Sequence, residues 1–190
     1  MKNILTMLIV TLPYLITIMY LFATDSENDQ VDIQKTYHEI SELKEEIPYI
    51  EDKKHDIWKT YHANGQLKEE IPYVDGKEHG IAKWYYESGE LHAERPHVDG
   101  KEHGISKWYY ESGELWMEWP FVNDEMHGIH KGYYKNGKLE YEMQYVNGKE
   151  HGIYREYYEN GQLKSESRYV DGEKSGTNNY DENGNIIIKK

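Results

Sequence analysis

Histidine is the first residue type in this chain whose spacing could support chemistry. His55, His79, His103, His127 and His151 recur every 24 residues, and imidazole is a common zinc ligand. If each period holds two β-strands, consecutive histidines lie about 9.6 Å apart. Zinc ligands must each lie about 2.0–2.1 Å from the ion. We therefore predict no metal site and interpret the histidines as structural residues beside turns.

Cations and carboxylates recur at the same spacing. A hairpin closed by a two-residue turn at Ser88-Gly89 places Lys83 opposite Glu94. The same count predicts five further cross-strand pairs: Lys35–Glu46, Lys59–Glu70, Lys107–Glu118, Lys131–Glu142 and Arg155–Glu166. Each pair contributes about 0.2–1 kcal/mol, and together the pairs penalise register slips. Carboxylates paired in this way stay ionised and make poor general acids.

No other catalytic signature is present. The chain has no Gly-x-Ser-x-Gly elbow, phosphate loop or His-Glu-x-x-His motif. It has no cysteine, which excludes disulfides, thiolate chemistry and Cys-ligated zinc. A position repeated along the chain also argues against one asymmetric active site. We predict that the protein is not an enzyme and has no catalytic residues and no cofactor.

Aromatic residues are the best candidates for binding, because interfaces favour aromatic anchors. Two Trp-Tyr-Tyr runs lie in mid-chain, close to two further tryptophans. The predicted partner-binding surface consists of Trp84, Tyr85, Tyr86, Trp108, Tyr109, Tyr110, Trp116 and Trp119. The alternative is that these rings pack against one another within a sheet.

Each 24-residue period contains the signals of two strands and two tight turns. Asn136-Gly137 and Asn147-Gly148 show the two turns of one unit, and such dipeptides are strong hairpin signals. The stretches between turns are rich in Tyr, Trp, Ile and Val, as strands are. The predicted fold is all-β, an elongated antiparallel meander in a single layer. A bulge or break is expected at one recurring proline position, occupied by Pro48, Pro72, Pro96 and Pro120.

The charge balance restricts the partners. The chain carries 22 Lys and Arg against 35 Asp and Glu, a formal net charge of −13. Such a chain does not neutralise phosphates, which argues against nucleic acid and anionic lipid headgroups. A basic protein is the electrostatic complement. Surplus acids also keep an open sheet soluble, which is the simpler interpretation.

The N-terminal segment differs from everything after it. Residues Ile4 to Phe22 carry no charge, and this length nearly spans a bilayer. We predict a hydrophobic helix that acts as a cleaved signal peptide or an uncleaved signal anchor. Lys2 precedes the segment and acids follow it, so the positive-inside tendency places the repeats outside the cytoplasm. The expected localisation is periplasmic, extracellular or anchored to the inner membrane.

The repeat pattern resembles the bacterial MORN repeat variant. The stretches Tyr157–Leu163 and Tyr145–Gly152 carry the match best, and the resemblance extends from residue 32 to about 186. It implies a β-hairpin repeat fold without catalytic residues. Many similar bacterial proteins are labelled antitoxin components of toxin–antitoxin pairs, and MORN repeats are associated with membrane recognition and with scaffolding.

These observations predict four regions. They are a signal peptide or anchor at 1–23, an acidic linker at 24–31, six hairpin repeats at 32–175, and a truncated capping repeat at 176–190. The predicted function is a protein-interaction module, with neutralisation of a partner in the manner of an antitoxin or immunity protein as one form. The alternative is a cell-envelope or glycan-binding module that uses the repeated Trp and Tyr residues.

Overall fold

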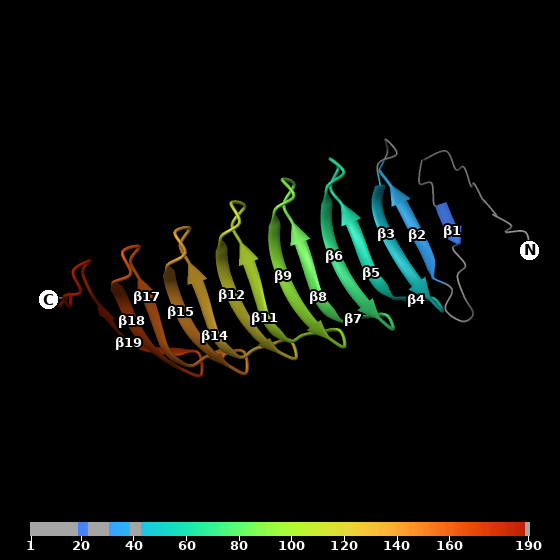
Figure 1. Cartoon of the computed structure of the whole chain (residues 1–190). Helices are drawn as coiled ribbons and strands as arrows, with labels where there is room; N and C mark the ends of the chain where they lie inside the picture. The colour runs from blue at the N-terminus through green and yellow to red at the C-terminus, as the bar shows by residue number, and fades with distance from the viewer. Residues whose placement is uncertain (1–18, 23–30, 39–42, 189–190) are drawn as a thin grey trace, which may run out of the picture. The chain divides into compact units, whose positions relative to one another are not determined.

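The computed structural model describes residues 19–22, 31–38 and 43–188 (Figure 1). Every regular element in these ranges is a β-strand. The chain divides into two compact units, the first comprising Met1–Leu91 with His97–Gly100 and the second His92–Pro96 with Lys101–Lys190. The all-β antiparallel meander of repeated hairpins is therefore confirmed within each unit.

The first unit is a meander of strands that pair in chain order. Its strands are β1 (Met19–Phe22), β2 (Asp32–Tyr37), β3 (Leu43–Ile50), β4 (Lys53–Lys54), β5 (Asp56–Tyr61), β6 (Leu67–Val74), β7 (Lys77–Glu78) and β8 (Gly80–Tyr85). Antiparallel pairing runs β1–β2–β3–β5–β6–β8. The short strands β4 and β7 pair with the ends of β3 and β6.

The second unit repeats this arrangement. Its strands are the central part of β9 (Leu91–Val98), then β10 (Lys101–Glu102), β11 (Gly104–Tyr109), β12 (Leu115–Val122), β13 (Glu125–Met126), β14 (Gly128–Tyr133), β15 (Leu139–Val146), β16 (Lys149–Glu150), β17 (Gly152–Tyr157), β18 (Leu163–Val170) and β19 (Glu173–Asn179). Antiparallel pairing runs β9–β11–β12–β14–β15–β17–β18–β19.

The predicted N-terminal helix over Ile4–Phe22 falls almost entirely outside the described residues. Its last four residues, Met19–Phe22, form β1, which pairs antiparallel with β2. The prediction is therefore wrong for these four residues, whose backbone is held in an extended ladder. In the described ranges no helix is long and apolar enough to cross a membrane.

From the second repeat onward, the first turn differs from the predicted two-residue loop. In the β11–β12 hairpin, the amide of Tyr110 donates to the carbonyl of Glu114, and the amide of Gly113 donates to that of Tyr110. The loop thus holds three residues, and only its glycine has positive φ. This extra residue shifts the register by one, and a bulge beside Tyr109 shifts it back. Lys107 therefore still faces Glu118, as the two-residue count predicted.

The second turn of each repeat is the predicted two-residue loop. Asp75 and Gly76 both have positive φ, at 50° and 78°, as a type I′ turn requires. The flanking residues Val74 and Lys77 pair directly. Asn147-Gly148 and Asp171-Gly172 have the same geometry, which matches the right-handed twist of the strands they join.

The expected break at the recurring proline is wrong. Pro72 lies inside β6 opposite Ile57, and the register shift of that hairpin lies at its other end. The Pro72 carbonyl accepts the amide of His79 at 2.9 Å, so the proline nitrogen faces the same side, where the chain passes from β7 to β8 and forms no ladder. Proline is tolerated there because no N–H is needed. A Cβ on Gly80 would lie 3.1 Å from the Pro72 ring, which explains the glycine after this histidine.

Side chains alternate between two faces of each hairpin, and only one face is well buried. On β11, Ile105, Lys107 and Tyr109 share what we call the ladder face. Ser106 and Trp108 share the opposite, packed face. The buried side chains of the second unit lie on the packed face, among them Ala93, Ser106, His130, Met143, Ser165 and Ser167. No helix of the described ranges covers either face.

Candidate functional site

The ladder face of the first unit carries a row of alternating charges. Glu46 lies opposite Lys35 within its hairpin and opposite Lys59 of the next hairpin. Glu70 likewise lies between Lys59 and Lys83. The Lys35 ammonium forms an ion pair with Glu46, and the hydroxyl of Tyr61 donates to the same carboxylate at 3.0 Å. Burial alone would raise the pKa of Glu46, but these hydrogen bonds and the two lysine charges lower it overall.

The second unit continues the same pattern. Its row runs Glu94, Lys107, Glu118, Lys131, Glu142, Arg155 and Glu166, with each residue opposite the next. Arg155 joins its two neighbours directly: Nη1 lies 3.2 Å from Glu142 and Nε lies 3.1 Å from Glu166. The structure therefore places five of the six predicted pairs opposite one another. The Lys83–Glu94 pair has one member in each unit and stays a prediction.

Sequence reasoning missed half of this ladder. It counted pairs within hairpins, whereas every internal carboxylate also faces a cation of the next hairpin. It also missed the tyrosines. Five hydroxyls donate to the glutamate 15 residues earlier in the chain, from Tyr61, Tyr85, Tyr109, Tyr133 and Tyr157. Burial and then the bond to Glu94 raise the pKa of Tyr109 to about 12, so it stays a donor. The fixed 15-residue spacing was the signal that could have revealed them.

The eight predicted aromatic site residues do not share one face. Tyr85 and Tyr109 lie on the ladder face with their hydroxyls bound to glutamates. Trp84 follows the alternation to the packed face, as Trp108 does. Tyr86 directly precedes the first-turn loop, and its amide donates to the carbonyl of Glu90.

The remaining predicted rings pack against neighbours in the second unit. Trp108 and Trp119 meet on the packed face with ring centroids 5.4 Å apart. Tyr110 and Trp116 meet beside the first-turn loop at 5.8 Å, and the Tyr110 hydroxyl donates to the carbonyl of Tyr133. Most of these rings are thus engaged in packing within the sheet.

An aromatic row centred on His130 runs along the packed face of the second unit. The imidazole of His130 lies 4.6 Å from the ring of Trp119 and 5.2 Å from that of Tyr141. Tyr154 continues the row beyond Tyr141, at 6.3 Å. Burial lowers the pKa of His130 to about 4, so the ring is neutral near pH 7. No pattern in the sequence predicted that this histidine would be buried among aromatic rings.

The 24-residue histidine series lies beside the second turns. The amides of His55, His79 and His103 donate to the carbonyls of Pro48, Pro72 and Pro96. The imidazole Nδ1 of His79 lies 3.6 Å from the Asp99 carboxylate. Within the described ranges, no three His, Asp or Glu side chains come together in a way that could hold a metal ion.

Exposed isoleucines form a feature that sequence reasoning did not single out. Ile57 and Ile81 of the first unit are 41% and 51% exposed, and Ile105 and Ile129 of the second are 52% and 49% exposed. All four occupy one repeat position on the ladder face of their own unit, two residues before the Lys of the charge row. We call them the isoleucine row. The recurring Ile-x-Lys spacing was visible in the sequence, but which face remains exposed was not.

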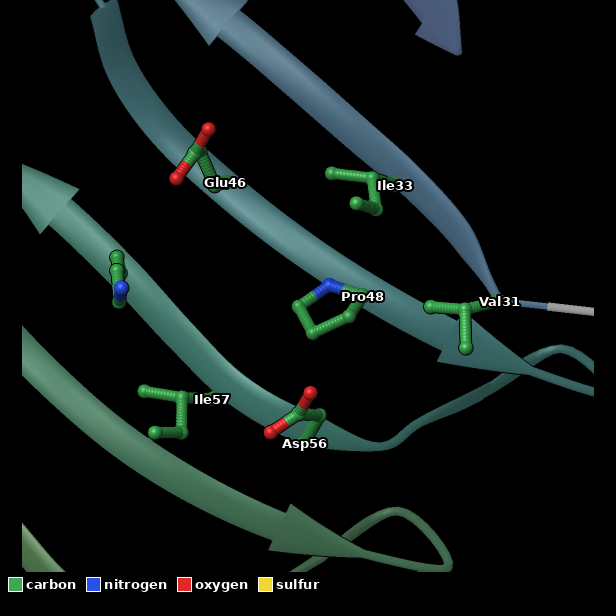
Figure 2. Close-up of a pocket in the computed structure, with 7 residues that line it drawn as sticks. Val31, Ile33, Glu46, Pro48, Asp56 and Ile57 are labelled. Atoms are coloured by element: carbon green, nitrogen blue, oxygen red, sulfur yellow. The ribbon is translucent and has the colours of Figure 1, made fainter. Parts of the chain in front are cut away.

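A pocket of about 210 Å³ opens on the ladder face of the first unit (Figure 2). It is lined by Val31, Ile33, Glu46, Pro48, Asp56, Ile57 and Lys59. Apolar side chains of β2, β3 and β5 form its floor, and charged groups stand around them. The pocket combines one member of the isoleucine row with part of the charge row.

Comparison with known proteins identifies the repeat. The model of the MORN repeat variant family matches residues 57–75, 78–99, 102–123, 126–147 and 150–171. No curated protein matches the chain. Among solved structures, a mutant of S. aureus TarM in complex with fondaparinux, alpha-GlcNAc-glycerol and UDP is 14% identical with a TM-score of 0.36. A second TarM crystal structure is 15% identical with the same TM-score. Each match covers 50% of this chain and 19% of the TarM chain, so the chain spans about a fifth of that protein's length.

Proposed function

The chain belongs to the MORN repeat variant family, and from this premise we propose that it is a non-enzymatic module that binds a protein partner through the ladder face. The observation that carries the proposal is the isoleucine row. Four large apolar side chains recur at one position, and about half of each side chain is exposed. Repeat proteins present extended binding surfaces in this way, because each unit adds the same contact.

The energetics favour a protein as the ligand. Full burial of an isoleucine contributes about 1.5–3 kcal/mol, so the half that remains exposed offers about 1 kcal/mol per residue. The neighbouring charges are already matched by cations and tyrosines of the same face, so a partner covering the row need not separate them. A contact of this kind gains affinity from area and shape, as protein interfaces do.

Charge and the N-terminal segment support the proposed partner and compartment. The net charge of −13 favours a basic partner. Neutralisation of such a partner, in the manner of an antitoxin or immunity protein, is one specific form of the proposal. The apolar stretch from Ile4 to Phe22 supports export or membrane anchoring, with the repeats outside the cytoplasm. Mass spectrometry of the N-terminus after cell fractionation tests this placement.

The test of the binding face compares matched substitutions in the full chain. A partner recovered at low salt is titrated against the wild type and against Ile105→Ser and Ile129→Ser. Each change should weaken binding about fivefold, because each removes about 1 kcal/mol of buried apolar contact. Ile188→Ser is the control, since Ile188 is 79% exposed but lies outside the row. Equal affinities for all four proteins would refute the assignment of this face.

A second candidate function is binding of a glycan or the cell envelope. It is supported by the aromatic row on the packed face, where rings such as Trp119 and Tyr141 flank His130. Aromatic rings can stack on sugars, although these rings also pack on one another. Retention of the protein on a purified wall fraction, lost in Trp108→Ala but kept in Ile105→Ser, would favour this function over the first. No retention would exclude it.

A further inference from the structure

The pocket in the first unit contains an acid where the later repeats have glycine. Asp56 occupies the repeat position of Gly80, Gly104 and Gly128, and it has a φ of +64°. Left-handed backbone costs a non-glycine residue about 1–2 kcal/mol. At Gly80, an added Cβ would lie against the preceding proline. Asp56 has a Cβ at this position, and its side chain lines the pocket with Pro48 (Figure 2).

The Asp56 carboxylate is the uncompensated charge of the lining. Lys59 stands opposite both Glu46 and Glu70, and Glu46 also pairs with Lys35, so these groups neutralise one another. Among the residues described, none donates a hydrogen bond to the Asp56 side chain or forms an ion pair with it. The pocket therefore presents one unmatched negative charge beside an apolar floor.

The size of the pocket restricts what it can hold. Small-molecule sites in proteins usually measure about 300–1,000 Å³, and this pocket measures about 210 Å³. It suits one side chain better than a cofactor. Its apolar floor of Ile33, Pro48 and Ile57 would contact an aliphatic stem, while Asp56 would meet a charged end. Arginine and lysine combine these two features, since they bury their stems along apolar surface and keep the head polar.

We propose that this pocket receives an arginine or lysine side chain of a basic protein partner, with the cation on Asp56 and the stem on Pro48 and Ile57. The inference deepens the proposed function and rests on it for the identity of the partner. The charge of the whole chain, −13, favours the same class of partner. The first hairpins would then differ in role from the later ones, where the glycine offers no carboxylate.

The test uses a probe and needs no partner. N-acetyl-arginine methylamide is titrated into the full chain labelled with nitrogen-15, with N-acetyl-citrulline methylamide as its neutral analogue. The arginine probe should shift the amide signals of residues 46–59 in a saturable way and bind at least threefold more tightly than the citrulline probe. Asp56→Asn keeps the side-chain shape, tolerates left-handed φ, and should weaken the arginine probe about fivefold.

Asp75→Asn is the matched control. Asp75 is also acidic, exposed and at positive φ, but it lies outside the pocket, so its loss changes only the net charge. Equal weakening by both variants would overturn the site, as would equal binding of the two probes or shifts spread over the whole chain. Self-association that Asp56→Asn abolishes would show that a second copy of this chain occupies the pocket. It would overturn the proposal that a different protein does so. Because the probe acts without a partner, a failed pull-down refutes the proposed function and leaves this result intact.

Discussion

Replacing Gly132 by alanine should destabilise the second unit, although alanine normally stabilises a strand relative to glycine. Gly132 pairs with Tyr141 across β14 and β15, and the ring lies over the glycine. An added Cβ would lie 2.5 Å from Cζ and 2.9 Å from Cδ1 of that ring. Carbon atoms normally approach to about 3.5–4.0 Å, so the ring must move by about 1 Å. It would then lose the contacts of its hydroxyl with Met117 and His130, both at 3.4 Å.

The magnitude follows from two opposing effects. Overpacking a filled site costs about 1–3 kcal/mol, and replacing glycine by alanine in a strand returns about 0.5–1 kcal/mol. The net loss should be about 1–2 kcal/mol. With an m-value of about 2 kcal/mol/M, the midpoint of urea unfolding should fall by about 0.5–1 M. Circular dichroism of the full chain measures this midpoint.

A double-mutant cycle separates the ring contact from other effects. Tyr141→Leu removes the ring, so Gly132→Ala in that background should cost at least about 1 kcal/mol less than in the wild type. An unchanged or higher midpoint for Gly132→Ala alone would refute the reasoning. Additive losses in the cycle would show that the steric conflict lies with another neighbour of Gly132.

Three further predictions concern a buried histidine, a glycine against a proline ring, and the charge row. The free energy of unfolding should fall by about 1–2 kcal/mol as pH drops from about 6.5 to about 4, because burial holds the pKa of folded His130 at about 4 and the unfolded chain binds the proton first. Urea melts at several pH values should show a weaker pH dependence for His130→Ser than for the wild type, and an unchanged slope would contradict the prediction. Urea unfolding should show a loss of stability of about 2–4 kcal/mol for Gly104→Ala and about 1–2 kcal/mol for Gly113→Ala. Both glycines have positive φ, but only at Gly104 would the added Cβ contact a proline ring, that of Pro96 at 2.9 Å. Equal losses of stability would exclude the contact. Arg155→Met should lower the free energy of unfolding by about 1 kcal/mol in thermal melts, since its two ion pairs are partly exposed. An unchanged melting temperature would show that the charge row does not contribute to the stability of the unit.

The turns show which parts of the fold could be predicted from the sequence and which could not. Asn or Asp before glycine marked four of the six second turns, because positive φ at both positions leaves few choices of residue. Glu51-Asp52 and Asn123-Asp124 have positive φ at both positions without a glycine. Asn before glycine misled at the first turn, where Asn136 has ordinary φ and only Gly137 is left-handed. A three-residue loop with a bulge and a two-residue loop demand the same glycine. Both leave Lys131 opposite Glu142, so the pairing pattern could not tell them apart.

The division into a buried and an exposed face could not be predicted from alternation. Both faces contain aromatic residues. Which face is buried depends on small residues, which allow the side chains of neighbouring strands to pack together. Ser106 and Ala93 are buried on the packed face, while the larger Ile105 lies opposite Pro120 on the ladder face and remains 52% exposed. The candidate site therefore differs from the predicted aromatic surface. Trp108 packs within the sheet, whereas Ile105 faces solvent.

The charge row and the packed face have different tasks in specifying this fold. Every cation–carboxylate pair of the row is chemically alike. The row therefore fixes the residue-by-residue register of neighbouring strands, but it does not distinguish one hairpin from another. The packed face differs between repeats: Gly132 with Tyr141 fills the space that Trp108 with Met117 fills one repeat earlier. Because large and small residues exchange places across the pair, a hairpin shifted by one repeat would meet either a steric conflict or a cavity. The order of the hairpins therefore depends on these pairs. The ladder face can keep its isoleucines and Asp56 exposed, because none of them is needed to hold the strands in register.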